Sequence, residues 1–202
     1  SYDVSPFIRD YLSVKQKKIT GMKDIYTEFK AYAEKKPGEM ESIMEDLLDY
    51  AKRYNKLLFG HPSFPAKLKA SLFRLNRFES SVTRPFLMEV MRLQEGSLLT
   101  LDDVAEICRI VESYLLRRII CDLPSNTLAK VFLTMSSDIK RFDGTYSNFI
   151  EKMKYVLTSK KEKAAFPDNE TFADCLRTKN IYAMLPRYKA YLFERLENGD
   201  SN

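Results

Sequence analysis

Apolar residues recur at helical spacing along almost the whole chain. The longest such pattern places seven apolar residues three or four positions apart over about five turns: Met40, Ile43, Met44, Leu47, Ala51, Tyr54 and Leu58. No segment alternates apolar and polar residues convincingly over the length of a strand. The chain is therefore predicted to be all-α, an irregular helical bundle of about ten helices with no sheet.

Proline and glycine divide this helical pattern. Gly60, Pro62 and Pro65 cannot all lie inside one helix. We therefore predict an N-terminal helical subdomain over residues 1–59 and a main helical bundle over residues 66–198. Ser5, Thr145 and Asp168 each precede an apolar stripe and are predicted to cap helices.

One predicted helix, beginning after Thr100, carries a cation on its apolar face. Thr100 and Asp103 have capping-box spacing, and the stripe that follows is Val104, Ile107, Cys108, Val111, Leu115 and Ile119. Arg118 lies on this stripe, whereas Arg117 points to the other side of the helix. A buried guanidinium needs a carboxylate, a run of carbonyls or an anionic ligand. We interpret Arg118 as a structural buried charge paired with a carboxylate, for which Glu79, Glu194 and Glu197 are candidates; contact with a nucleic-acid phosphate is the alternative.

Basic residues are in excess in the middle of the chain. Residues 66–95 contain six basic and three acidic residues, interspersed with Phe73, Phe78 and Phe86. This arrangement is typical of a nucleic-acid-binding surface backed by aromatic packing. The candidate nucleic-acid-binding residues are Arg74, Arg77, Arg84 and Arg117. The alternative is a solvated helix face above core phenylalanines.

The residues that most catalytic and metal sites require are scarce or scattered. The six glycines are dispersed, so no phosphate-binding loop is present, and the single histidine, His61, has no nearby partner for catalysis or metal binding. We therefore expect no catalytic residue, metal site or cofactor. Cys108, Cys121 and Cys175 are expected to be free buried thiols in a reducing compartment. Because the sequence also shows no apolar run of membrane-spanning length and no signal peptide, we expect a cytoplasmic protein.

Three stretches carry a resemblance to a known family. Residues 110–132 (IVESYLLRRIICDLPSNTLAKVF) resemble the helical middle region of GmrSD-type, modification-dependent restriction endonucleases. Residues 7–19 (FIRDYLSVKQKKI) are similar to the entry into that region, and residues 166–198 are similar to its exit. The family's N-terminal nucleotidase domain, marked by a DGQQR motif, and its C-terminal HNH nuclease domain have no counterpart here. We therefore expect an excised middle region.

The resemblance implies a non-catalytic helical scaffold in a bacterial phage-defence protein, whose full-length parent is a nucleotide-dependent endonuclease. The implied partners are the flanking nucleotidase and HNH nuclease domains of the parent, together with DNA if the basic surface contacts it. The alternative function is a protein-protein interaction module that binds no nucleic acid. An exposed patch of tyrosines and phenylalanines would favour that alternative, and a contiguous stripe of arginines and lysines would favour DNA.

Overall fold

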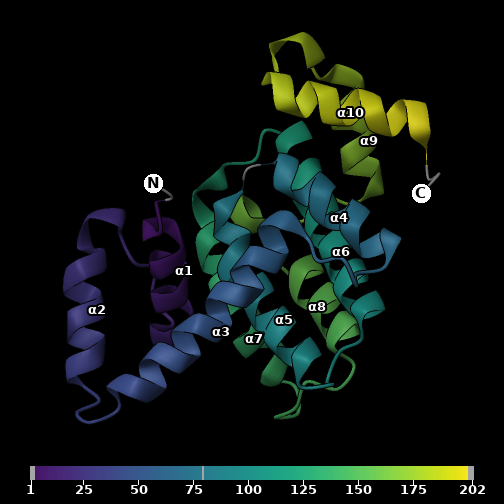
Figure 1. Ribbon diagram of the computed structural model, residues 1–202. Coiled ribbons are helices and arrows are strands. Elements are labelled where there is room, and N and C mark those ends of the chain that lie inside the picture. The colour runs from purple at the N-terminus through teal and green to yellow at the C-terminus, as the bar shows by residue number, and fades with distance from the viewer. Residues whose placement is uncertain (1–2, 79, 200–202) are drawn as a thin grey trace.

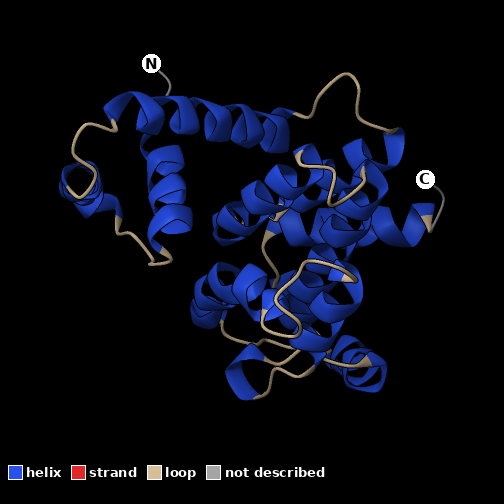
Figure 2. Ribbon diagram, turned by 90° about the horizontal axis from the view of Figure 1, so that it is seen from below, coloured by secondary structure: helices blue, strands red, loops and turns tan. Residues whose placement is uncertain are grey.

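The computed structural model describes residues 3–78 and 80–199, and every regular element in these residues is a helix. Ten α-helices follow one another in the described chain: α1 (Ser5–Gln16), α2 (Ile25–Glu34), α3 (Met40–Phe59), α4 (Ala66–Arg77), α5 (Arg84–Glu95), α6 (Leu101–Ile120), α7 (Leu128–Lys140), α8 (Phe149–Thr158), α9 (Asn169–Thr178) and α10 (Pro186–Asn198). Figures 1 and 2 show their arrangement, with no strand among the drawn elements. The predicted all-α bundle is confirmed.

The helices form a central group with a smaller group at each end. In Figure 1, α4 and α6 lie side by side near the centre, with α5, α7 and α8 beside them. On one flank, α1 and α3 pack against α5, and α2 lies outermost against α1. At the other end, α9 and α10 lie across the ends of α4 and α6. The central group is thus covered on two sides by helices from the two ends of the chain.

Most of the buried apolar residues form one large cluster that crosses the predicted subdomain boundary. Tyr11 of α1 and Tyr50 of α3 belong to the same cluster as Met88 of α5, Val111 of α6 and Tyr191 of α10. The break between the predicted subdomains is present, because α3 ends at Phe59 and α4 begins at Ala66. Its Phe64 side chain is also buried in this cluster, so the loop is fixed against the core it interrupts.

Two of the predicted helix caps are present, and two differ. Thr100 and Asp103 form a reciprocal capping box at the start of α6, and Asp168 accepts a hydrogen bond from the Thr171 N–H at the start of α9. The prediction for Thr145 is wrong, since α8 begins only at Phe149. The Thr145 hydroxyl instead donates to Asp143 at 2.9 Å. Ser5 is the first residue of α1 and not its cap.

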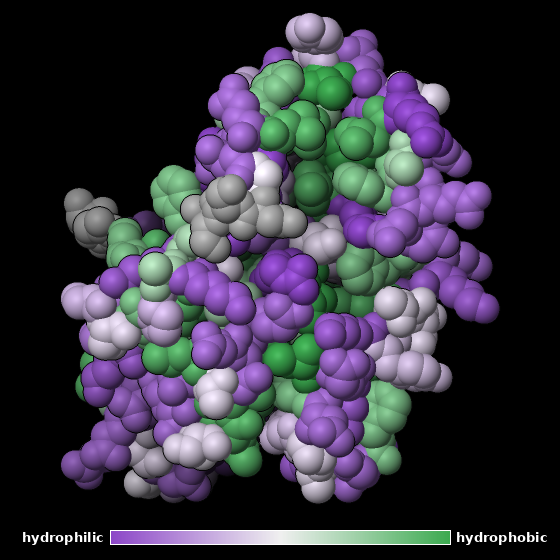
Figure 3. Space-filling view, turned by 90° about the vertical axis from the view of Figure 1, so that its right-hand side faces the viewer, coloured by the Kyte–Doolittle hydropathy of each residue, from purple (hydrophilic) through white to green (hydrophobic). Residues whose placement is uncertain are grey.

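On the face shown in Figure 3, an apolar area lies near α9 and α10. Figure 3 shows apolar side chains gathered at the upper end of the molecule, the end that α9 and α10 occupy in Figure 1. Phe193 and Leu196 of α10 are exposed. Within residues 3–78 and 80–199, no helix combines the length and the apolar content that crossing a bilayer requires.

Candidate functional site: buried arginines and an apolar hollow

Arg118 is buried, as the sequence indicated, but its partners are backbone carbonyls. Its Nη1 donates to the carbonyl oxygen of Ala165 at 2.8 Å, and its Nη2 donates to those of Pro124 and Lys163, each at 2.6 Å. The guanidinium also lies 5.1 Å from the centre of the Tyr114 ring. Several carbonyl dipoles converging on one cation offset the cost of burying it.

The expected carboxylate partner of Arg118 is therefore wrong. Glu194 pairs with Arg77, and Glu197 is exposed on α10. The third candidate, Glu79, lies outside the described residues. The carbonyl alternative that the sequence left open is the one that the fold uses, because the segment joining α8 to α9 crosses α6 directly above Arg118.

Arg117, the preceding residue of α6, holds the same segment. Its Nη1 donates to the carbonyl oxygen of Pro167 at 2.9 Å, and its Nη2 donates to Asn169 Oδ1 at 2.6 Å. The guanidinium carbon lies 5.7 Å from the Phe166 ring centre and 5.1 Å from that of Phe172. Tyr114 of α6 also donates its hydroxyl to the carbonyl of Ala164 at 2.7 Å. Three side chains of α6, those of Tyr114, Arg117 and Arg118, therefore bind the segment 163–169, mostly through its backbone carbonyls.

Arg74 and Arg77 of α4 form ion pairs that tie α4 to α6 and α10. Arg74 Nε lies 3.1 Å from Glu112 Oε1, and the two side chains are only 12% and 6% exposed. The same Glu112 carboxylate accepts a hydrogen bond from the hydroxyl of Tyr191. Burial and this carboxylate raise the pKa of Tyr191 well above its ordinary value. Arg77 pairs with Glu194.

Arg84, the last of the four candidate DNA contacts, binds α3. Its Nη1 donates to the Tyr54 hydroxyl at 2.9 Å. The four arginines lie on three helices, α4, α5 and α6, and each has a partner inside the protein. Of the phenylalanines expected behind them, Phe78 and Phe86 are buried and Phe73 is exposed. Contact of these arginines with DNA stays a prediction.

Two of the three cysteines are paired, which corrects the expectation of three free thiols. Cys121, directly after α6, and Cys175 in α9 form a disulfide with their Cα atoms 5.2 Å apart. The two residues are 54 positions apart in sequence, so their spacing gave no sign of pairing. Cys108 is free and buried as expected, and burial raises the pKa of its thiol to about 12.

His61 and the acidic residues form no recognisable metal-binding group. Among residues 3–78 and 80–199, no three His, Cys, Asp or Glu side chains lie together in a way that could hold a metal ion. His61 is exposed, and its Nδ1 lies 2.7 Å from the Ser63 hydroxyl. In the described structure, His61 thus forms a hydrogen bond within the turn that follows α3.

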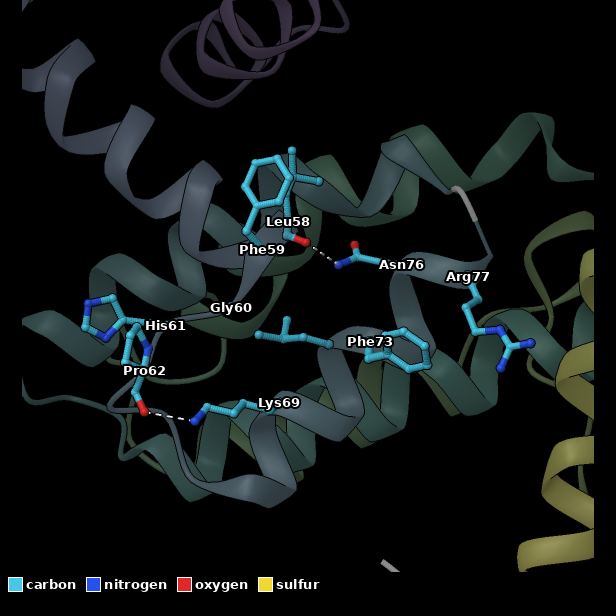
Figure 4. A pocket seen from close by; sticks show the side chains of 10 residues that line it. Leu58, Phe59, Gly60, His61, Pro62, Lys69, Phe73, Asn76 and Arg77 are labelled. Carbon is cyan, nitrogen blue, oxygen red and sulfur yellow. Dashed lines mark hydrogen bonds between the residues drawn. The ribbon is translucent and has the colours of Figure 1, made fainter.

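An apolar hollow of about 630 Å³ lies between the end of α3 and one face of α4. Figure 4 shows Phe59 at the end of α3, His61 and Pro62 in the following loop, and Lys69 and Phe73 on α4 around this hollow. The rings of Phe59 and Phe73 are 66% and 63% exposed. Phe59 had no assigned role and Phe73 was expected behind the basic surface, because a helical stripe does not reveal which of its members lack a covering element.

Comparison of the chain with protein-family models, with curated proteins and with solved structures found no match.

Proposed function

We propose that the chain is the non-catalytic helical middle region of a bacterial DNA-targeting defence protein of the GmrSD type. In this role it is a rigid scaffold between a nucleotide-hydrolysing domain and an HNH nuclease domain. The resemblance over residues 110–132 motivates the proposal, and the observation that best supports it concerns the two arginines within that stretch. Arg117 and Arg118 both bind the backbone of the segment 163–169, which is the bonding expected of a rigid connecting unit.

The scaffold proposal is tested by the gene sequence on either side of this chain. A DGQQR motif upstream and an HNH motif downstream would support it, whereas a reading frame that contains neither would contradict it. The purified chain is expected to hydrolyse no nucleotide and to cleave no plasmid DNA in the presence of divalent metal. Hydrolysis or cleavage that copurifies with the protein and is abolished by a point substitution would also contradict a non-catalytic role.

A DNA-contacting surface is the second part of the proposal, with Arg74, Arg77, Arg84 and Arg117 as the candidates. Since each has an internal partner, binding would require these side chains to exchange that partner for phosphate. A mobility-shift assay at about 50 mM and about 200 mM salt tests this, because phosphate contacts weaken steeply over that range. A low-salt shift that Arg77→Glu abolishes would support DNA contact, and no shift at micromolar protein would leave the scaffold role alone.

A protein-interaction module is the second candidate function, and one observation favours it. The exposed Phe59 and Phe73 rings flank a single apolar hollow, whereas each of the four candidate arginines already has a partner inside the protein. Exposed aromatic side chains around a concave apolar surface are typical of sites that bind other proteins.

A further inference from the structure

The walls of the hollow between α3 and α4 consist mostly of apolar side chains. Leu58 and Phe59 line it from α3, and Leu72 and Phe73 line it from α4. Phe59 and Phe73 keep about two thirds of their surface in contact with solvent. Leaving two large rings in water forgoes the free energy that their burial would supply. An occupant that covers both rings would therefore be favoured by the hydrophobic effect.

The polar groups around the hollow already have partners. The Asn76 side-chain amide donates to the carbonyl of Leu57 at 2.9 Å, and Lys69 Nζ donates to the carbonyl of Pro62 at 2.8 Å, as Figure 4 shows for Lys69. A ligand recognised by its own hydrogen bonds, such as a nucleobase, would find few unpaired groups here. The lining instead suits apolar side chains.

The surroundings of the hollow are basic. Residues 50–78 contain seven lysines and arginines and no aspartate or glutamate. Carboxylates from outside this segment pair with five of them. Asp49 pairs with Lys52, Glu95 with both Arg53 and Lys56, Glu112 with Arg74, and Glu194 with Arg77. Lys69, which lines the hollow, is exposed and has no carboxylate of the described residues within ion-pair distance, whereas Lys67 is not among the lining residues. The remaining charge beside the apolar walls is thus positive.

We infer that the hollow between α3 and α4 docks an acidic segment of another protein, whose large apolar side chains cover Phe59 and Phe73 and one of whose carboxylates faces Lys69. This inference rests on the second proposed function, the interaction module. A single lysine without a carboxylate partner cannot supply a row of phosphate contacts along a nucleic acid, but it matches one carboxylate beside an apolar anchor.

The experiment uses a fluorescein-labelled peptide of about 15 residues, with leucine and phenylalanine at helical spacing and glutamates between them. Fluorescence anisotropy measures its binding to the whole chain. The double variant Phe59→Ser with Phe73→Ser is expected to weaken binding at least about tenfold, because the apolar side chains of the peptide lose the two rings that they contact. Lys69→Glu is expected to weaken it further by charge repulsion.

Matched control variants lie elsewhere on the surface. Phe142→Ser removes a phenylalanine that is 50% exposed on another face, and Lys130→Glu reverses an exposed lysine on α7; both should leave binding unchanged. A peptide with lysines in place of glutamates, and one with serines in place of the apolar residues, should bind much more weakly. Because all substituted side chains are exposed, the variants should retain the wild-type circular dichroism spectrum and melting temperature.

Several outcomes would overturn the inference. Absence of binding, equal binding of the lysine peptide, or competition by a single-stranded oligonucleotide would each exclude an acidic protein segment as the occupant. Binding that the Phe59 and Phe73 substitutions leave unchanged would keep the interaction-module function and reject this site. Sedimentation that shows a dimer dissociating in the double phenylalanine variant would assign the hollow to a second copy of the chain.

Discussion

Arg118 Nη2 donates to the carbonyl oxygen of Lys163 at 2.6 Å, and this bond joins the buried end of α6 to a loop 45 residues further along the chain. The same carbonyl accepts the hydroxyl of Thr127 at 2.9 Å. The carbonyl of Lys163 is therefore shared between α6 and the short turn that precedes α7. One guanidinium thus fixes two connections, one before α7 and one before α9.

Replacing Arg118 with methionine should destabilise the protein by about 3 kcal/mol. The substitution retains a long apolar stem but leaves the carbonyls of Pro124, Lys163 and Ala165 without their charged donor. Urea denaturation followed by circular dichroism gives the change in unfolding free energy. Arg109→Met on the same helix is the control, because Arg109 is 61% exposed and should change stability by less than about 1 kcal/mol. Equal effects of the two substitutions would contradict the role of Arg118.

Glu112 should be coupled energetically to Arg74. Glu112→Gln leaves the guanidinium of Arg74 buried without a counter-charge, so we expect a loss of about 3 kcal/mol. Adding Arg74→Met should restore part of that loss, since the double variant contains no unpaired buried charge. A double-mutant cycle in urea measures the coupling, which should exceed about 1 kcal/mol. A double variant whose loss of stability equals the sum of the two single losses would contradict this coupling.

The helical pattern of the sequence predicted most of the fold because it depends on local spacing. The stripe from Met40 to Leu58 became α3, and Thr100 with Asp103 marked the beginning of α6. Arg118 was also identified correctly as buried, because a position on an apolar stripe faces the core whatever side chain it carries. These properties follow from neighbours within a few turns.

The partners of the same residues could not be predicted, since they come from distant segments. Backbone carbonyls such as that of Lys163 have no sequence signature, so a carboxylate was expected at Arg118 instead. Cys121 meets Cys175 only because α9 packs on α6. The exposure of Phe73 depends on which face of α4 no other helix covers, and the apolar spacing of α4 does not indicate that face.

The Cys121–Cys175 disulfide should contribute up to about 4 kcal/mol of stability, because it closes a loop of 54 residues in the unfolded chain. Cys121→Ser with Cys175→Ser should lower the melting temperature, and a reductant should lower that of the wild type but not that of the variant. Thiol titration of the unreduced chain should find no reactive group until unfolding exposes Cys108, whose thiol is buried and has a pKa raised to about 12. Three reactive thiols in the unreduced, unfolded protein would contradict the pairing.

The buried carboxylate of Asp10 should make stability fall as pH rises through the mildly acidic range. Burial raises the pKa of Asp10 to about 6, although Arg9 donates to its Oδ1 at 2.8 and 2.6 Å. Because the folded state then holds its proton more tightly than the unfolded state, the stabilising effect of protonation is complete below about pH 4 and lost by about pH 6. Asp10→Asn removes this titration, so its stability relative to the wild type should increase over that range by about 2 to 3 kcal/mol. Urea denaturation at intervals from pH 4 to pH 7 measures the difference, and a difference independent of pH would show that Asp10 titrates normally.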